Sequence, residues 1–210
     1  DALGLTTSRL VGYEADDLMA TLARLARKQG LRTWLVSPDK DLFQLVDDRE
    51  PAIQIYDRTA KEVIGSDAVR AKMGVAPCHA TTFQALVGDS SDNVPGVRGV
   101  GPKAATALVS AFGGLDAIYA HLEEVPTLEV RGAKALSTKL REGREDAYLA
   151  LRLVTLCDTV PMELALPVAQ WALWSGPKPE AEAFFSELGT LGPLNRLRRA
   201  AEQRREASST

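Results

Sequence analysis

Apolar residues recur at helical spacing near the start of the chain. Leu18, Leu22 and Leu25 lie three or four positions apart, and Gly30 follows them as a stop signal. Met19 and Ala26 stand beside these positions and widen the apolar face. The pattern predicts an amphipathic helix over Tyr13–Gln29.

Three shorter apolar runs follow this helix. The run "RTWLV" predicts a buried strand over Arg32–Val36, and "LFQLV" predicts a short helix after the acidic loop "SPDKD". The segment "AIQIYDRTAKEVIG" has two β-rich runs around "DRTAK", which predicts a hairpin at the edge of a sheet. Helix, strand, acidic loop and helix together predict an α/β layer.

Strand signals stop after about Ala76, and helical patterns take over. "WSGPKPEAEA" has the composition of a linker into a last helix, and "REASST" that of a frayed tail. We therefore expect an α/β fold class, with a partial Rossmann-like (PIN-like) parallel sheet and helices followed by an all-helical part. The domains expected are an α/β core over residues 1–76, a helical subdomain over 77–160, and a C-terminal helical extension with a tail over 161–210. The helical segments expected after the sheet are Cys78–Val87, Pro102–Ala111, Leu115–His121, Ala133–Leu140, Arg144–Leu153 and Glu180–Leu188.

Composition limits the classes of protein and of chemistry. With 210 residues, 45% of them hydrophobic, the chain can bury a core in one large domain or two small ones. No apolar run approaches the roughly 20 residues that span a bilayer, and "DALGLTTSRL" is no signal peptide, so we expect a cytoplasmic protein without a membrane partner. Cys78 and Cys157 are too few for a disulfide scaffold, and we expect reduced thiols in the core. His79 and His121 lie in no nucleophile or metal motif, and we expect both to be ordinary surface or structural residues.

Acidic residues gather in three short stretches before residue 93. One stretch opens the first helix, one follows the first strand, and one precedes a glycine-rich segment. Taken singly, each has an ordinary structural explanation, since acids in a first turn complement the helix dipole and Asp often caps turns and helices. The seven carboxylates are Glu14, Asp16, Asp17, Asp39, Asp41, Asp89 and Asp92.

The three stretches have a different meaning when they are considered together. The ends of strands and the starts of the following helices share one rim of an α/β sheet, so we expect the carboxylates to converge. Carboxylates in close quarters repel one another unless cations neutralise them, and such hard oxygen ligands suit Mg²⁺ or Mn²⁺. Two such ions about 3.5–4 Å apart can activate water and stabilise a leaving oxygen, which predicts phosphodiester hydrolysis without a histidine.

The stretch "VPGVRGVGPKAA" predicts a site for the substrate. Its glycines permit tight turns, and Pro102 suits the first position of the next helix, so backbone N–H groups can point at an anion. We expect that anion to be a DNA phosphate, bound without base preference. A glycine-rich connection between two packed helices is the alternative. The residues expected to contact DNA are Gly96, Arg98, Gly99, Gly101 and Lys103.

The order and spacing of "GYEADD", "SPDKDLFQLV" and "LVGDSSDNVPGVRGVGPKAA" resemble the 5′ nuclease domain of bacterial DNA polymerase I, in the flap endonuclease family. The resemblance extends from Asp1 to about Arg199. It implies removal of 5′ flaps, or of short RNA or DNA pieces, in DNA replication and repair, and a helix-hairpin-helix that grips a flapped or nicked duplex.

The resemblance also implies which residues bind each metal ion. The first acidic stretch would serve the metal nearer the scissile phosphate, and the other two would serve mainly the second metal. It adds a K⁺ ion at hairpin carbonyls, for which Val97, Gly99 and Val100 are in position. The metal ligands implied are thus Glu14, Asp16 and Asp17 for one ion and Asp39, Asp41, Asp89 and Asp92 for the other.

The sequence departs from this family at its beginning. A first strand ending in a metal-binding Asp and a helical arch with basic and Tyr residues are not found, nor is a polymerase part, and "DALGL" resembles the end of a helix. We therefore expect a monomer with low or no nuclease activity alone, whose partners include the missing N-terminal part and a polymerase domain. The alternatives are a non-catalytic DNA-binding fragment and, with "DKD" and "DSSD" as ligands, a structural Ca²⁺ site that lacks the EF-hand pattern.

Overall fold

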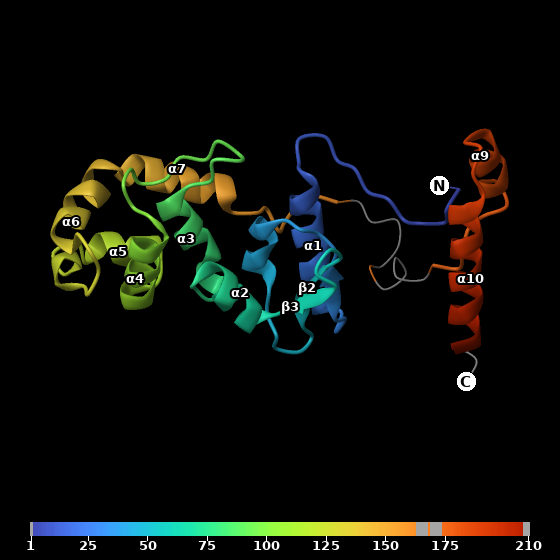
Figure 1. The fold of residues 1–210 in the computed structure, drawn as a ribbon, viewed down its shortest axis with the longest axis horizontal. Helices are drawn as coiled ribbons and strands as arrows, with labels where there is room; N and C mark the ends of the chain where they lie inside the picture. Colours follow the sequence, from blue (N-terminus) through green and yellow to red (C-terminus); the bar gives the residue numbers. More distant parts are fainter. Residues whose placement is uncertain (1, 163–167, 169–173, 208–210) are drawn as a thin grey trace. The chain divides into compact units, whose positions relative to one another are not determined.

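The protein is described by a computed structural model that covers residues 2–162, 168 and 174–207 (Figure 1). The chain folds into two compact units. The larger unit is formed by residues 16–160, and the smaller one combines residues 1–15 with residues 161–210.

The first half of the larger unit is a small α/β layer. Its sheet has the order β1-β2-β3: β1 pairs with β2 in parallel, and β2 pairs with β3 antiparallel. Ile53 and Ile55 of β2 are buried while Gln54 between them is not, as expected for a strand with one face in the core. Asp57 closes the turn after β2 by accepting from the backbone N–H groups of Thr59 and Ala60. The elements are α1 (Ala15–Lys28), β1 (Thr33–Leu35), η1 (Lys40–Leu45), β2 (Ile53–Asp57), β3 (Glu62–Ile64) and α2 (Ser66–Met73).

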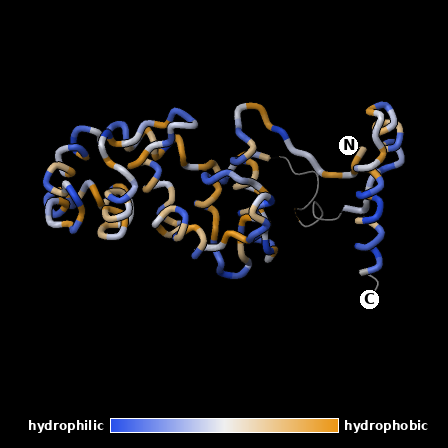
Figure 2. The backbone as a smooth tube through the Cα atoms, viewed as in Figure 1, coloured by the Kyte–Doolittle hydropathy of each residue, from blue (hydrophilic) through white to orange (hydrophobic). Residues whose placement is uncertain are grey.

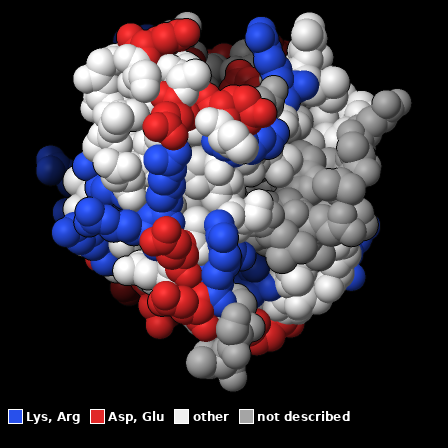
Figure 3. Space-filling model, turned by 90° about the vertical axis from the view of Figure 1, so that its right-hand side faces the viewer, with Lys and Arg blue, Asp and Glu red and all other residues white. Residues whose placement is uncertain are grey.

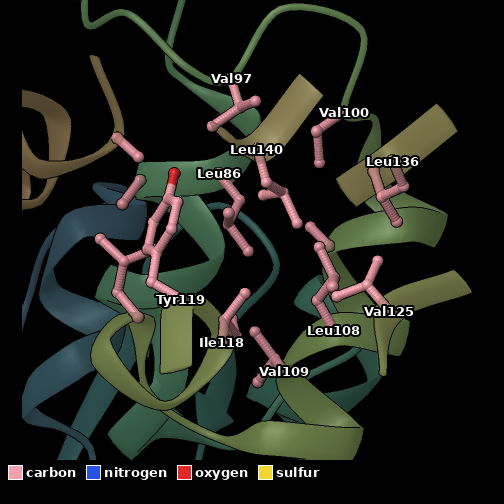
Figure 4. Packing of buried hydrophobic residues seen from close by; sticks show 14 of the residues in the cluster. Leu86, Val97, Val100, Leu108, Val109, Ile118, Tyr119, Val125, Leu136 and Leu140 are labelled. Carbon is pink, nitrogen blue, oxygen red and sulfur yellow. The ribbon is translucent and has the colours of Figure 1, made fainter. Parts of the chain in front are cut away.

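The second half of the larger unit is helical. Helix α3 packs against α4 and α7, and against η1 of the α/β layer. Leu86 of α3, Leu108 of α4 and Leu140 of α6 are fully buried in one cluster, which Figure 4 shows from close by. The elements are η2 (Pro77–His79), α3 (Ala80–Val87), α4 (Pro102–Phe112), α5 (Leu115–Ala120), η3 (Val125–Thr127), α6 (Ala133–Glu142) and α7 (Arg144–Val154).

The smaller unit includes a pair of helices, α9 (Ala181–Glu187) and α10 (Gly192–Ala207). Phe185 and Leu194 are buried between them, and the Trp174 indole donates a hydrogen bond of 2.8 Å to the Leu3 carbonyl. Helix α10 is mostly hydrophilic in Figure 2. Basic and acidic side chains are interspersed on the face drawn in Figure 3, so this face does not carry charge of a single sign.

Most of the predicted elements are confirmed, but two helices were missed and several expectations are wrong. Helix α2 and helix α10 were not expected, and α10 continues to Ala207 where the sequence predicted a frayed tail. Residues 2–3 form a turn and not the end of a helix. The strand expected to be buried over Arg32–Val36 is shorter, Thr33–Leu35, and Trp34 and Val36 are exposed. Cys78 is exposed and Cys157 is half-buried, so neither thiol lies in the core. Across the described part of the chain, no helix has both the length and the apolar character that crossing a membrane requires.

Candidate metal centre and nucleic-acid interface

Four of the predicted carboxylates gather in one place, which we call the acidic pocket: Asp39, Asp41, Asp89 and Asp92, with Lys40 among them. Asp39 ends the loop after β1 and Asp41 lies in the first turn of η1, whereas the loop after α3 supplies Asp89 and Asp92. A hollow of about 380 Å³ opens between the two loops and is lined by Asp39, Lys40 and Asp92. The predicted convergence of the second and third acidic stretches is therefore observed.

Asp39 and Asp41 are held by local hydrogen bonds. Asp39 Oδ1 accepts a hydrogen bond of 2.9 Å from the Asp41 backbone N–H and caps the N-terminus of η1. The structural explanation considered for this residue, that it caps a helix, is therefore correct. Asp41 Oδ1 accepts from the Gln84 side-chain amide of α3. Partial burial raises the pKa of Asp41, and the nearby charges of Asp39 and Asp89 raise it further, while the Gln84 hydrogen bond opposes them. A nearby cation would favour the charged form of Asp41 and so oppose these effects.

Asp89 is the most deeply placed member of the acidic pocket, with 5% of its surface exposed. Its Oδ2 lies 2.6 Å from Lys40 Nζ, and its Oδ1 accepts from the backbone N–H and the hydroxyl of Ser91. The Lys40 ammonium, followed by the Ser91 hydroxyl, lowers the pKa of Asp89 to about 2. Asp89 therefore stays ionised at all but strongly acidic pH.

The first acidic stretch lies at the start of α1. Asp16 and Asp17 occupy its first turn, and Glu14 comes one residue before it. Asp17 Oδ1 accepts a hydrogen bond of 2.8 Å from the Cys157 backbone N–H. Among the described residues no three Asp, Glu, His or Cys side chains form a group that could hold a metal ion. That these three acids complete a centre with the acidic pocket stays a prediction.

The donor chemistry of the acidic pocket fits a divalent cation. Its carboxylates are hard oxygen ligands, and one ammonium is the positive charge placed among four negative ones. Like charges this close raise the free energy of the folded state unless further positive charge is bound. That a hard cation binds to the side chains of Asp39, Asp41, Asp89 and Asp92 stays a prediction, since no three acidic side chains among the described residues already form a ligand group.

The glycine-rich stretch forms a loop between α3 and α4, which we call the hairpin loop (residues 94–101). Its start pairs with the acidic pocket, because Asp89 and Val94 exchange two backbone hydrogen bonds. A Cβ at Gly96 would lie 2.4 Å from the Gly88 nitrogen, so this close approach of two backbones requires glycine. Gly99 has φ +80, the left-handed conformation that glycine adopts without strain. The conformation of the hairpin loop therefore depends on glycine at these two positions.

The predicted DNA contacts lie around this loop. Arg98 and Lys103 are exposed, and Gly101 caps α4 with Pro102 at its first position, as the sequence predicted. Two carbonyls of the implied potassium site already accept hydrogen bonds: that of Val97 from the Val100 N–H at 2.9 Å, and that of Gly99 from Lys139 Nζ at 3.0 Å.

Four polar residues of these sites escaped the sequence analysis. Lys40 stands between two of the predicted ligands, so it could have been noticed in the sequence. Gln84 is a buried polar residue of α3, and the sequence shows it only as one polar position among apolar ones. Ser91 lies inside the third acidic stretch. Lys139 lies 40 residues after the loop that it reaches, and no local pattern points to it.

Comparison with known proteins identifies the family. The model of the N-terminal resolvase-like domain of 5′-3′ exonucleases matches residues 1–74, and that of their C-terminal SAM fold matches residues 75–175. The chain belongs to the 5′-3′ exonuclease family. The resemblance inferred from the three motifs is thus confirmed.

Relatives of this family extend well beyond the chain. DNA polymerase I of Pseudomonas aeruginosa is 38% identical over 206 residues, which are 96% of this chain and 22% of the polymerase. A 5′-3′ exonuclease of Buchnera aphidicola subsp. Acyrthosiphon pisum is 34% identical over 164 residues, which are 78% of this chain and 56% of the exonuclease. The chain therefore spans about a fifth of the first relative and about half of the second.

Solved structures share the fold. T5 5′-exonuclease with bound zinc ions has a TM-score of 0.59 and 25% identity, over 70% of this chain and 52% of the exonuclease. A T5 D15 flap endonuclease in complex with DNA and metal ions has a TM-score of 0.59 over the same shares of the two chains, at 24% identity. The expected fold class, an α/β core followed by a helical subdomain, is confirmed.

Proposed function

We propose that the chain is the metal-binding and DNA-gripping part of a structure-specific 5′ nuclease that acts on DNA 5′ flaps and 5′ ends in replication and repair. One observation carries this proposal: the acidic pocket and the hairpin loop are joined directly, through the paired backbones of Asp89 and Val94. A DNA phosphate held at the hairpin loop then belongs to a strand that passes near the carboxylates.

The acidic pocket would hold one divalent cation, Mg²⁺ or Mn²⁺, and the acids at the start of α1 a second. Bound there, such ions supply charge that polarises a phosphoryl oxygen and lowers the pKa of a water molecule. The role of the protein is to orient the ligands: Ser91 fixes Asp89, Gln84 fixes Asp41, and Cys157 fixes Asp17. Lys40 provides a positive charge that keeps Asp89 ionised.

The hairpin loop and the start of α4 would bind the sugar-phosphate backbone of DNA. The first N–H groups of a helix have no partner within the helix and favour an anion, and Arg98 and Lys103 add positive charge beside them. Contacts of this kind give affinity without sequence preference. A K⁺ ion at the carbonyls of Val97, Gly99 and Val100 stays a prediction.

The proposal includes the setting of the chain. We propose that it works as a monomer in the cytoplasm, next to further nuclease residues and a polymerase domain, as the names and lengths of its relatives suggest. We also propose the domain division at residues 76 and 160.

A non-catalytic DNA-binding fragment is the second candidate. It is favoured by Lys40, whose ammonium lies against the deepest carboxylate of the acidic pocket, and by the lack of a three-ligand group among the described residues. Such a fragment would bind flapped DNA through the hairpin loop without cutting it.

Cleavage of a labelled 5′-flap duplex with and without Mg²⁺ separates the two candidates. We expect slow, Mg²⁺-dependent cutting that EDTA abolishes and that Asp92→Asn reduces at least about tenfold. Asp67→Asn, a charge loss at the exposed start of α2, is the matched control and should cut like the wild type. Cutting that persists in EDTA contradicts the metal mechanism, and binding without any cutting favours the second candidate. Tight Ca²⁺ binding without DNA affinity would contradict both.

A further inference from the structure

Lys139 reaches the hairpin loop from a distant part of the chain. It stands in the last turn of α6, and its Nζ donates a hydrogen bond of 3.0 Å to the carbonyl oxygen of Gly99. Its side chain lies along Gly99: a Cβ there would be 2.9 Å from Nζ, 3.2 Å from Cε and 3.4 Å from Cδ. The missing side chain at Gly99 thus makes room for the lysine.

The position of Lys139 is fixed by the core below it. Figure 4 shows Val97 and Val100 pointing from the hairpin loop toward Leu140 and Leu136 of α6, and all four are buried. The chain also approaches closely at the end of α6, where a Cβ at Gly143 would lie 2.9 Å from Val97 Cγ1. Helix α6 and the hairpin loop therefore form one packed body.

The charge of Lys139 is not neutralised within the described part of the chain. Its ammonium is bound to a carbonyl, which carries no net charge, and forms no ion pair with a described carboxylate. An ammonium has three N–H groups, so two remain for another acceptor. Lys139 and the exposed Arg98 both line a hollow of about 540 Å³ beside the hairpin loop.

Two acids limit where an anion can bind in this hollow. Glu142 and Asp146 line it as well, and their charges oppose a phosphate. A phosphate is therefore favoured at the turn itself, where Gly99 has no side chain and where Lys139 and Arg98 provide positive charge. This position continues the DNA interface proposed for the hairpin loop.

From this geometry we infer that Lys139 is a DNA-phosphate contact of the hairpin loop, and that its ammonium is the cation that the Gly99 carbonyl holds against the DNA backbone. The inference rests on the proposed DNA-binding function and adds a residue that its motifs do not contain. It also has a consequence for ions. A cation that is part of the protein makes DNA binding at this loop independent of K⁺.

DNA binding by the full chain tests this inference. A fluorescein-labelled nicked duplex with a 5′ flap is titrated in EDTA, which prevents cutting, and anisotropy is measured in KCl and in tetramethylammonium chloride at equal ionic strength. We expect the wild type to bind equally in both salts. Lys139→Met should bind about fivefold more weakly, with the slope of log K against log salt reduced by about 0.9, the loss of one phosphate contact.

Two further variants control this comparison. Lys134→Met removes the same charge from the exposed first turn of α6 and should bind within about twofold of the wild type. Lys139→Arg keeps the charge and should recover most of the affinity. Thermal melting by circular dichroism identifies any variant that fails to fold, and the salt comparison on the wild type needs no variant at all.

Each contrary result has a distinct meaning. Lys139→Met binding as tightly as Lys134→Met, or wild-type affinity that falls when K⁺ is replaced, overturns the role of Lys139 and leaves the proposed function intact. A wild-type chain that does not bind DNA in either salt overturns the proposed function, and this inference with it.

Discussion

Lys40 Nζ lies 2.6 Å from Asp89 Oδ2, so the most buried carboxylate of the acidic pocket has a counter-ion from the start of η1. The lysine side chain is about half exposed, whereas that of Asp89 is almost fully buried. The pair therefore holds the start of η1 against the loop after α3 and keeps two of the three acidic stretches together.

Removing this counter-ion should destabilise the fold. Lys40→Met leaves the Asp89 carboxylate buried without its cation, and we expect the free energy of unfolding in EDTA to fall by about 2 kcal/mol, less than for a fully buried pair because Lys40 is half exposed. Urea unfolding measures the change. Lys28→Met, at the exposed end of α1, should change stability by less than about 0.5 kcal/mol. Equal effects of the two substitutions would show that the Lys40 pair contributes nothing.

The pKa of Asp89 predicts a pH dependence with a definite sign. Because its folded pKa is lowered from 3.8 to about 2, the stability that it contributes is fully present above about pH 4 and is lost as the pH falls through about 2. At neutral pH we expect Asp89→Asn to be less stable than the wild type by about 2 kcal/mol. Urea unfolding between pH 7 and pH 2 should show this difference closing in the acid range. A difference that is the same at every pH would contradict the assignment.

Asp41 should respond in the opposite direction. Its pKa is raised, mainly by burial, so its charged form is unfavourable in the fold, and stability is lost as the pH rises through that pKa. In EDTA we expect Asp41→Asn to raise the Tm by about 1–3 °C, whereas millimolar Mg²⁺ should stabilise the wild type more than the variant. Differential scanning fluorimetry with and without Mg²⁺ measures both effects. A wild-type Tm that ignores Mg²⁺ would count against a metal site in the acidic pocket.

The close approach at Gly96 gives a prediction about the hairpin loop. Gly96→Ala places a Cβ 2.4 Å from the Gly88 backbone nitrogen, so the loop must move, and we expect a loss of about 2–3 kcal/mol of stability together with weaker DNA binding. Gly114→Ala adds a Cβ that meets no atom within 4 Å and should cost at most about 1 kcal/mol, as a change at the N-cap of α5. Chemical unfolding compares the two variants. A Gly96→Ala variant as stable as Gly114→Ala would show that the loop tolerates displacement.

Local patterns were sufficient to predict most elements. The spacing of Leu18, Leu22 and Leu25 placed α1 to within two residues at each end, and "DRTAK" located the β2–β3 turn. Helix α2 was missed because it has only one buried residue, Val69, so its eight residues lack an apolar stripe. Helix α10 was missed because it is rich in Arg and follows a glycine-rich turn. Elements that bury few side chains leave a weak periodic signal.

The gathering of four carboxylates in the acidic pocket could be predicted from the sequence, but the side chains that contact the site could be predicted only in part. Asp39, Asp41, Asp89 and Asp92 could be named because acids at strand and helix ends share a rim. Lys40 could have been named with them, since a lysine between two ligands must lie near both. Lys139 could not, because its hydrogen bond to Gly99 depends on how α6 packs against the hairpin loop, which is a property of the whole helical core.

One face of α1 forms hydrogen bonds with residues 157–160, the segment that follows α7. Asp17 accepts from the Cys157 N–H, Thr21 accepts from the Val160 N–H, and Arg24 donates to the Asp158 carbonyl, at positions four and three residues apart. Residues 157–160 thus stabilise the position of the helix that carries Asp16 and Asp17 of the first acidic stretch. A shortened form of this protein should therefore keep residues 157–160. A chain that ended before Cys157 would lack these hydrogen bonds, and helix α1, which carries Asp16 and Asp17, would be less stable.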